Sequence, residues 1–167
     1  MKKTAIIYSS KSGKTARIGE KIAHAFGDNK IDILDALDIT GEKFIEYDNL
    51  ILGVPTWFDG ELPHYWDEFV PDLEELDLKG KNIAIYGLGD QVHYPQNFVD
   101  AIGLMSEIVI DCGAHVVGHT STEGYTYESS NSVVDDKFLG LVIDQENQSA
   151  LTNARVVKWV EDLKQVF

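Results

Sequence analysis

Short apolar runs alternate with apolar residues at helical spacing along the whole chain. Runs with the length of buried strands lie at residues 4–8, 31–34, 50–54, 82–88, 115–119 and 138–144. Between them, apolar residues three and four positions apart predict helices at residues 15–26, 97–112 and 152–167. A short helix is expected at residues 40–45, and another from Pro63 that Pro71 should kink or end.

This alternation predicts one α/β domain over residues 1–167, built on a doubly wound parallel sheet with helices on both faces. The length of 167 residues fits a single domain. In such sheets a ligand binds outside the carboxyl ends of the strands, near the point where the winding reverses. The chemistry is therefore expected in the loops that follow the first, third and fourth strands.

The loop after the first strand, "SSKSGKTA", contains half of a nucleotide-binding motif. The Gly-Lys-Thr of an ATPase loop needs a glycine five residues before Gly13, where this chain has Tyr8. Hydroxyl side chains remain instead, from Ser9 to Thr15, at the expected start of a helix. This arrangement suits a terminal phosphate, and it can equally be a serine-rich helix cap.

Two aromatic residues stand in the loops after the third and fourth strands. Trp57 lies in "PTWFDGEL" and Tyr94 in "GLGDQVHYPQN", where large rings are exposed unless something covers them. Together they could hold a flat heterocycle whose phosphate tail reaches the first loop. Taken one at a time, Trp57 could equally pack under the next helix, and Tyr94 could pack against the start of the following one.

With these three loops the sequence resembles the long-chain flavodoxins. Residues 10–15 are similar to the family's phosphate loop, Thr/Ser-x-Thr/Ser-Gly-x-Thr. "PTWFDGELP" is similar to the segment with the inner stacking tryptophan, and "GLGDQVHYPQNFVDAIG" to the segment with the outer stacking tyrosine. The resemblance implies a five-stranded sheet of order 2-1-3-4-5. Its fifth strand would be interrupted by an insertion at about residues 120–137.

The resemblance also implies a cofactor and a task. The cofactor is FMN, and the task is one-electron transfer at low potential between redox proteins, without substrate turnover and without catalytic or metal-binding residues. The hydroxyls of Ser10, Ser12 and Thr15 would hold the phosphate together with the loop amides. The implied cofactor-binding residues are Ser9, Ser10, Lys11, Ser12, Gly13, Lys14, Thr15, Pro55, Thr56, Trp57, Phe58, Asp59, Gly60, Leu88, Gly89, Asp90, Tyr94 and Asn97.

Around the flavin ring, the resemblance implies that Trp57 and Tyr94 form a sandwich. The peptide between Phe58 and Asp59 would turn toward flavin N5 on reduction, and Gly60 would leave room for that turn. Phe58 is bulkier than the residue usual in the family, which bears on how easily this peptide turns. Backbone groups that would meet the pyrimidine edge belong to Gly89, Asp90 and Asn97.

Two rival functions can be compared with the same residues. A phosphorylated receiver domain needs acidic residues where this chain has Ser9, Ser10 and Trp57, so that function is excluded. An FMN-dependent NAD(P)H:quinone oxidoreductase of the same fold stays as the alternative. Tyr94 argues against it, because an outer tyrosine would cover the flavin face that a hydride must reach.

Charge narrows the choice of partners. The net charge of −14 and the isoelectric point near 4.6 argue against nucleic acid or an anionic membrane. Redox proteins with basic docking surfaces are expected, with the acidic residues between 67 and 77 as a docking face or simply a solvated helix face. The cytoplasm is the expected location, since no span of 18 apolar residues occurs. A monomer is also expected. The histidines form no recognisable metal-binding motif.

The insertion and two carboxylates lead to further expectations. The polar composition of residues 120–137, with Tyr125 and Tyr127 expected at the surface, suggests an excursion that contacts partners and is not needed for the flavin. Asp59 and Asp90 lie on the two flavin loops and should lower the second reduction potential more than other carboxylates do.

Overall fold

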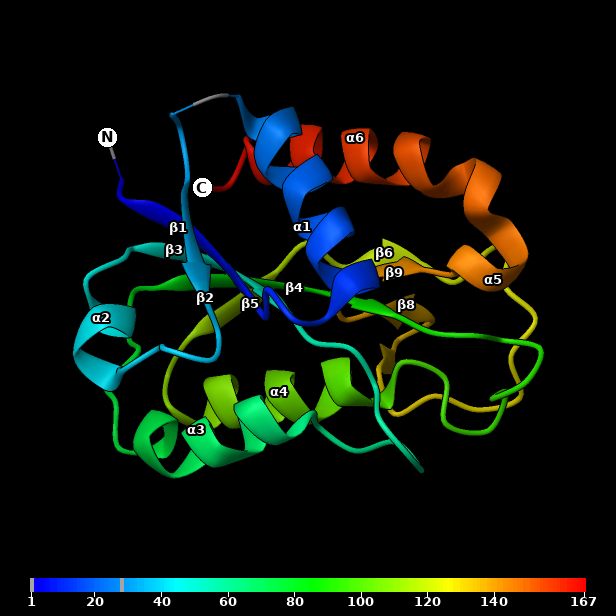
Figure 1. Cartoon of the computed structure of the whole chain (residues 1–167), viewed down its shortest axis with the longest axis horizontal. Helices are drawn as coiled ribbons and strands as arrows, with labels where there is room; N and C mark the ends of the chain where they lie inside the picture. The colour runs from blue at the N-terminus through cyan, green and yellow to red at the C-terminus, as the bar shows by residue number, and fades with distance from the viewer. Residues whose placement is uncertain (1, 28) are drawn as a thin grey trace.

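The computed structural model describes residues 2–27 and 29–167 as a parallel sheet between two layers of helices (Figure 1). The parallel strands are β1 (Thr4–Tyr8), β2 (Asp32–Asp35), β3 (Asn49–Gly53), β4 (Asn82–Leu88), β5 (His115–Val117) and β9 (Leu141–Ile143). The helices are α1 (Gly13–Phe26), α2 (Gly41–Ile45), α3 (His64–Glu74), α4 (Asp100–Asp111), α5 (Gln145–Gln148), a 3-10 turn (Ser149–Leu151) and α6 (Thr152–Leu163). Within the described residues, no helix is both long enough and apolar enough to cross a membrane.

The order of the parallel strands follows the doubly wound pattern. It runs β2-β1-β3-β4, and the fifth position, beside β4, is shared by β5 and β9. Residues 82–84 of β4 pair with β5, and residues 86–88 pair with β9. The predicted strand order and the interruption of the fifth strand are therefore confirmed.

Both faces of the sheet are buried, which explains the uninterrupted apolar runs in the sequence. Helices α1 and α6 cover one face, and α3 and α4 cover the other (Figure 1). Because side chains alternate along a strand, Ile6 and Ile51 pack on the side of α1 and α6, while Ile7 and Leu50 pack on the opposite side. All four side chains are fully buried. The loops at the carboxyl edge therefore start from well-packed positions.

Two differences from the predicted helices have local reasons, one at Pro71 and one at the start of α4. Pro71 does not end α3, which continues to Glu74 and keeps Leu73 fully buried. The missing N–H of a proline removes one helical hydrogen bond, and burial of the apolar face outweighs that loss here. Helix α4 begins at Asp100 and not at residue 97, because Val99 has a left-handed backbone (φ 49°) that an α-helix cannot include.

The insertion is folded and does not form an open loop. Strands β6 (Thr120–Ser121), β7 (Val133–Val134) and β8 (Lys137–Phe138) form a small antiparallel sheet of order β6-β8-β7. The run predicted as one strand at residues 138–144 thus divides between two sheets. Gly140 lies at the division and passes so close to β4 that an added Cβ would lie 2.0 Å from the Ile85 carbonyl oxygen.

The expectation that Tyr125 and Tyr127 lie at the surface is wrong. Both side chains are partly buried, and they pack around the buried ring of Phe98. The ring centroid of Phe98 lies 6.0 Å from that of Tyr125 and 5.4 Å from that of Tyr127. Phe138 closes the cluster, 5.0 Å from Tyr125. The tyrosines are therefore partly buried residues that pack against the core and join the insertion to the segment before α4.

The contact between α1 and the sheet gives a stability prediction at Gly19. A Cβ at this position would lie 2.4 Å from the Tyr8 ring and 2.7 Å from the Tyr86 hydroxyl, which itself donates to the Thr15 carbonyl. Gly19→Ala should therefore lower the free energy of unfolding by about 1–3 kcal/mol, although alanine is the better helix former by about 1 kcal/mol. Urea unfolding of the ligand-free protein measures the change.

Gly13→Ala is the matched control, because no atom lies within 4 Å of a Cβ at this position of the same helix. It should leave stability unchanged or raise it slightly. A Gly19→Ala protein as stable as the Gly13→Ala protein would show that the close packing of α1 on the sheet is mistaken.

Candidate functional site

Three loops meet at the carboxyl edge of the sheet. They follow β1, β3 and β4, which are neighbours in the sheet and run in the same direction. The first loop covers residues 9–12, the second residues 54–63 and the third residues 89–99. This is the edge where doubly wound sheets bind ligands, and it contains all the residues predicted from the sequence.

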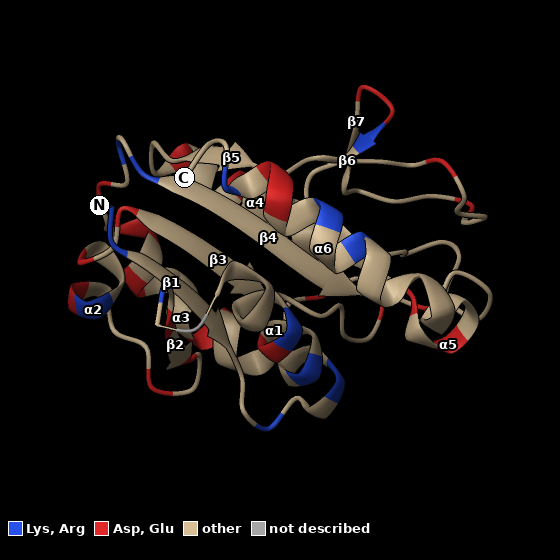
Figure 2. Ribbon diagram, turned by 90° about the horizontal axis from the view of Figure 1, so that it is seen from above, with Lys and Arg blue, Asp and Glu red and all other residues tan. Residues whose placement is uncertain are grey.

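The first loop ends in a helix start with unused hydrogen-bond donors. Among the described residues, the amides of Gly13, Lys14 and Thr15 have no acceptor, and the side chain of the N-cap residue Ser12 does not cap the helix. No acidic residue occupies the first turn of α1, and blue segments along the helix mark lysine and arginine (Figure 2). Unpaired amides at the positive end of a helix dipole attract an anion.

The hydroxyls of this loop are already engaged in internal contacts. Ser9 is buried and accepts from the Lys11 amide over 3.2 Å, and the Ser12 hydroxyl lies 3.2 Å from the Tyr65 hydroxyl. Ser10 donates to Asp35. Burial works to raise the pKa of Asp35, but hydrogen bonds, first of all from Ser10, outweigh it and lower that pKa. The Ser10 hydroxyl must therefore turn away from Asp35 before it can donate to a ligand.

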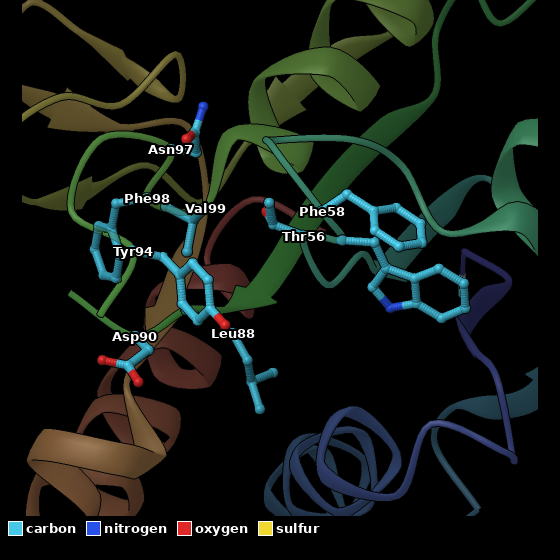
Figure 3. Close-up of a pocket in the computed structure, with 10 residues that line it drawn as sticks. Thr56, Phe58, Leu88, Asp90, Tyr94, Asn97, Phe98 and Val99 are labelled. Carbon is cyan, nitrogen blue, oxygen red and sulfur yellow. The ribbon is translucent and has the colours of Figure 1, made fainter. Parts of the chain in front are cut away.

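A cavity of about 420 Å³ separates the second loop from the third (Figure 3). Thr56 and Phe58 approach it from one side, Tyr94 lies on the other, and Leu88 lies at the end of β4. A neighbouring hollow of about 300 Å³ shares Trp57 and Tyr94 with it and extends to Lys14 and Thr15. Because they share lining residues, the two hollows adjoin each other and are here called the joined cavity, which extends from the aromatic loops to Lys14 and Thr15 at the start of α1.

The second loop is a tight hairpin that closes on itself. The Trp57 amide donates to the Glu61 carbonyl over 2.9 Å, and the Glu61 amide donates back over 2.7 Å. Between them Phe58 and Gly60 have left-handed backbones, with φ of 48° and 96°. Left-handed geometry is costly for a residue as large as phenylalanine, and the Phe58 side chain is 69% exposed. The hairpin therefore stores strain beside the cavity.

Trp57 packs edge-on against neighbouring rings and is only partly buried. Its ring centroid lies 5.9 Å from Tyr65 and 5.7 Å from His64, both nearly perpendicular to it. The indole is thus fixed from behind by α3 and still lines the cavity. The Trp57 ring therefore packs on the following helix and also lines the cavity, so the two alternatives considered for it are compatible.

Asp90 organises the turn that leads to Tyr94. Its carboxylate accepts from the amides of Val92 and His93 over 3.1 and 3.0 Å, and from Asn147 over 2.8 Å. Partial burial acts to raise the pKa of Asp90, but these hydrogen bonds, together with one to the His93 ring, prevail and lower the pKa to about 2. The Tyr94 amide donates to the Asp90 carbonyl over 2.9 Å, and the Tyr94 ring stays 65% exposed.

A buried polar network lies behind this turn. The Asp144 carboxylate is fully buried and accepts from the Gln91 side chain over 2.7 Å and from the Asn147 amide over 3.0 Å. The Gln91 side-chain oxygen in turn accepts from the Thr126 amide in the insertion over 2.5 Å. Every member is hydrogen-bonded, so the network holds the third loop without leaving a buried charge unsatisfied.

The structure brings most of the predicted site residues around the joined cavity. Those that line it are Lys14, Thr15, Pro55, Thr56, Trp57, Phe58, Leu88, Gly89, Asp90, Tyr94 and Asn97. The others line neither hollow: Ser9, Ser10, Lys11 and Ser12 of the first loop, Gly13 at the start of α1, and Asp59 and Gly60 of the second loop. Lys14 is paired with the exposed Glu146 of α5. Among the described residues, no group of three or more His, Cys, Asp or Glu could hold a metal ion.

Sequence reasoning missed several residues of the site. Phe98 and Val99 line the cavity, and Gln145 and Glu146 line its neighbour. The supporting network around Asp144 was also missed. An N-cap signal was available there, because Asp144 follows an apolar run and caps α5 through the Asn147 amide. No sequence pattern marks Phe98 and Val99, whose positions depend on contacts with a distant segment.

Comparison with known proteins agrees with this geometry. Residues 6–159 match the family described as Flavodoxin. The chain is 41% identical to Flavodoxin 1 of Escherichia coli strain K12 over 163 residues, which cover 97% of this chain and 93% of that one. It is 39% identical to a flavodoxin of a Synechocystis species over 168 residues, covering 100% and 99% of the two chains.

Solved flavodoxin structures have the same fold as this chain. The crystal structure of Fusobacterium nucleatum flavodoxin bound to flavin mononucleotide superposes with a TM-score of 0.95 at 33% identity, covering 100% of this chain and 99% of that one. Oxidised Flavodoxin 2 from Bacillus cereus gives a TM-score of 0.75 at 27% identity, covering 99% of each chain.

The lowered pKa of Asp90 predicts a pH-dependent contribution to stability. An unfolded chain has an aspartate pKa of about 3.9, so the ionised carboxylate stabilises the fold above that pH, and the contribution is lost as pH falls toward about 2. Asp90→Asn should lower the free energy of unfolding at pH 7 by about 1–2 kcal/mol. Urea unfolding at pH 7 and at pH 3 should show the difference from the wild type shrinking at the lower pH.

The exposed Asp38 serves as the control, and Asp38→Asn should change neither curve. A stability difference for Asp90→Asn that is the same at both pH values would contradict the assignment of the ionised carboxylate as the stabilising group.

Proposed function

The chain belongs to the flavodoxin family, and from this premise we propose that it binds one FMN between the Trp57 and Tyr94 loops and carries single electrons at low potential. Flavodoxins are electron-transfer flavoproteins and not enzymes with a substrate of their own. The observation that carries the proposal is the joined cavity, which runs from two aromatic side chains to the unpaired amides of α1. Bound FMN would supply the reversible one-electron chemistry.

The first loop would hold the phosphate. The free amides of Gly13, Lys14 and Thr15 offer three donors at the positive end of α1. The hydroxyls of Ser12 and Thr15 add two more, and Ser10 adds another once it leaves Asp35. The amides of Gly13, Lys14 and Thr15 are unpaired in the ligand-free protein, so binding a phosphate would satisfy them without breaking other backbone bonds. The Ser12 hydroxyl would exchange its contact with the Tyr65 hydroxyl for one with the phosphate.

The second and third loops would enclose the ring. Trp57 would cover one face and Tyr94 the other, while backbone groups of Gly89, Asp90 and Asn97 would meet the polar edge. The strained hairpin supports a role for the peptide between Phe58 and Asp59, because a left-handed Phe58 and Gly60 leave that peptide free of ladder bonds. This peptide would respond to a proton gained at flavin N5.

Surface charge would set the partners. The acidic residues between 67 and 77 are all exposed: Asp67, Glu68, Asp72, Glu74, Glu75 and Asp77. Most of them belong to α3, whose first turn packs against Trp57. We propose that this face docks redox proteins with complementary basic surfaces, which would make the association faster at low salt. A monomer in the cytoplasm remains part of the same proposal.

A comparison of FMN with riboflavin tests the phosphate site. Apoprotein should bind FMN at least about 100-fold more tightly than riboflavin, because riboflavin leaves the α1 amides unpaired. Ser12→Ala should weaken FMN binding and leave riboflavin binding unchanged. Fluorescence titration measures both constants, and the holoprotein alone should oxidise almost no NADPH. Equal affinity for FMN and riboflavin would exclude a phosphate site in the first loop.

A second test concerns the negative charge beside the ring. Asp59 is exposed on the hairpin, and its charge should disfavour the extra electron in the second reduction step. Asp59→Asn should raise that potential by about 20–60 mV, less at high salt. Potentiometric titration measures the shift, with Asp162→Asn on α6 as the control. If Asp59→Asn moves the potential no more than Asp162→Asn does, the carboxylate points fully into water and has no such role.

A further inference from the structure

A separate cavity of about 330 Å³ lies between the first residues of the insertion and α6. Helix α6 lies over β6 and β9 in Figure 1, and the walls of the cavity come from these parts of the chain. None of the residues that line it also lines the joined cavity, so it is not part of the candidate flavin site. A cavity of this size can take a small organic molecule.

The guanidinium of Arg155 stands in the wall of this cavity without a hydrogen-bond acceptor. The side chain is partly buried, and its Nη1 atom is buried and has no partner. Within the part of the chain that the structure describes, no N–H group of this side chain donates to an acceptor, and no carboxylate forms an ion pair with it. A buried donor without an acceptor costs free energy, because it has lost its contact with water. A ligand that brings acceptors to the guanidinium would remove this cost.

Tyr125 holds the guanidinium without neutralising its charge. The Arg155 Cζ lies 4.2 Å from the centroid of the Tyr125 ring, which is a cation–π contact. The Tyr125 hydroxyl donates to the Val142 carbonyl over 2.7 Å. Burial raises the pKa of Tyr125 to about 12, although the charge of Arg155 acts to lower it, so the tyrosine is neutral at ordinary pH. The result is a fixed guanidinium with an unpaired charge, which can bind a planar carboxylate through two parallel hydrogen bonds.

The other groups in the wall favour a monoanion with an apolar body. Lys158, the second cation of the lining, is already paired with Asp162 one helical turn away. Glu123 also lines the cavity, and two carboxylates in the wall would repel a dianion such as inorganic phosphate. Leu141 and Trp159 supply apolar surface. The lining thus offers one free positive charge beside apolar side chains.

From these observations we propose that the cavity between the insertion and α6 binds a small organic monocarboxylate, whose carboxylate pairs with Arg155 and whose apolar body fills the space beside Trp159. The sequence has 28 acidic side chains and 14 basic ones, so a carboxylate partner for this arginine would be easy to supply from within the chain. A guanidinium that nevertheless lacks one is suited to a partner from outside. The site is distinct from the flavin site, and the proposal does not depend on electron transfer.

Titration with benzoate tests the proposal, and the protein contains its own control. The chain has two arginines, Arg17 and Arg155, so the side-chain Nε–Hε spectrum of the FMN-loaded protein should show two arginine signals at mildly acidic pH. Benzoate should shift the Arg155 signal saturably, with a Kd of about 1 mM. The signal of Arg17, which is exposed on α1, should stay in place. Benzamide, which has the same shape without the charge, and inorganic phosphate at equal ionic strength should move neither signal.

Two variants distinguish a ligand site from a purely packing role of the arginine. Arg155→Met keeps an apolar side chain without the charge, and it should weaken benzoate binding at least about tenfold, followed through the Trp159 indole signal. Ala154→Leu narrows the cavity from α6 while Arg155 stays intact, and it should weaken binding as well. Val157→Leu is the matched control on the same helix, because Val157 is exposed and does not line the cavity. It should bind benzoate like the wild type.

A benzoate shift that does not saturate by about 20 mM would overturn the proposal. So would binding of unchanged strength in Arg155→Met, which would leave the arginine with only its contact to Tyr125. Phosphate or benzamide bound as tightly as benzoate would show that the cavity does not select a monocarboxylate. If Arg155→Met does not fold, Ala154→Leu and the two arginine signals of the wild type decide the question.

Discussion

Backbone N–H and C=O groups beyond the end of a parallel strand no longer have hydrogen-bond partners on the neighbouring strands. The three loops at the carboxyl edge of this sheet replace those partners in different ways, and the properties of the candidate site depend on this difference. The first loop replaces only some of them and leaves three amides open at the start of α1. The second pairs with itself through Trp57 and Glu61. The third borrows its partners from an insertion that interrupts a strand on the far side of β4. The same constraint thus leaves the first loop with unpaired amides for an anion, whereas the other two loops have backbone partners for the amides of Trp57 and Tyr94.

Loops with unpaired amides and loops with paired amides suit different parts of a ligand. Open amides gain most from a charged ligand group, which supplies the acceptors that the protein lacks. In the other two loops the amides of Trp57 and Tyr94 already have backbone acceptors, so each loop holds its aromatic residue in place before a ligand binds. Asp90 illustrates the second case, since its carboxylate is committed to the turn that carries Tyr94. Its charge is then held near the cavity without being available as a ligand.

The sequence predicted those features of the structure for which a residue type at a given position has a single physical explanation. Apolar runs buried on both faces predicted the strands, and Trp57 and Tyr94 were identified because exposed rings at strand ends need a reason. Pairings between distant segments left no such trace. Ser129, Ser130 and Ser132 looked like a polar surface, because composition does not show that a hydroxyl faces the carbonyl of a residue about 30 positions away.

Two other misses have the same origin. Val99 was placed inside a helix because valine carries no signal for a left-handed backbone. Asp100 looked like an ordinary first-turn carboxylate, which it is by position, while its function as a junction between Asn97 and Asn131 depends on the fold. Pro71 shows the opposite case. Of the two effects expected from this proline, a kink or the end of the helix, the end does not occur, because the burial of α3 outweighs the local signal.

Amide hydrogen exchange of the ligand-free protein, followed residue by residue by NMR, tests most directly whether the loops are satisfied in this unequal way. The amides of Trp57, Tyr94 and Phe98 should be protected, because each has a backbone acceptor in the folded chain. Those of Gly13, Lys14 and Thr15 should exchange quickly and become protected only when FMN is added. Rapid exchange at Phe98 and Tyr94 without ligand would contradict the account, since it would mean that the third loop is ordered by the cofactor and not by the insertion.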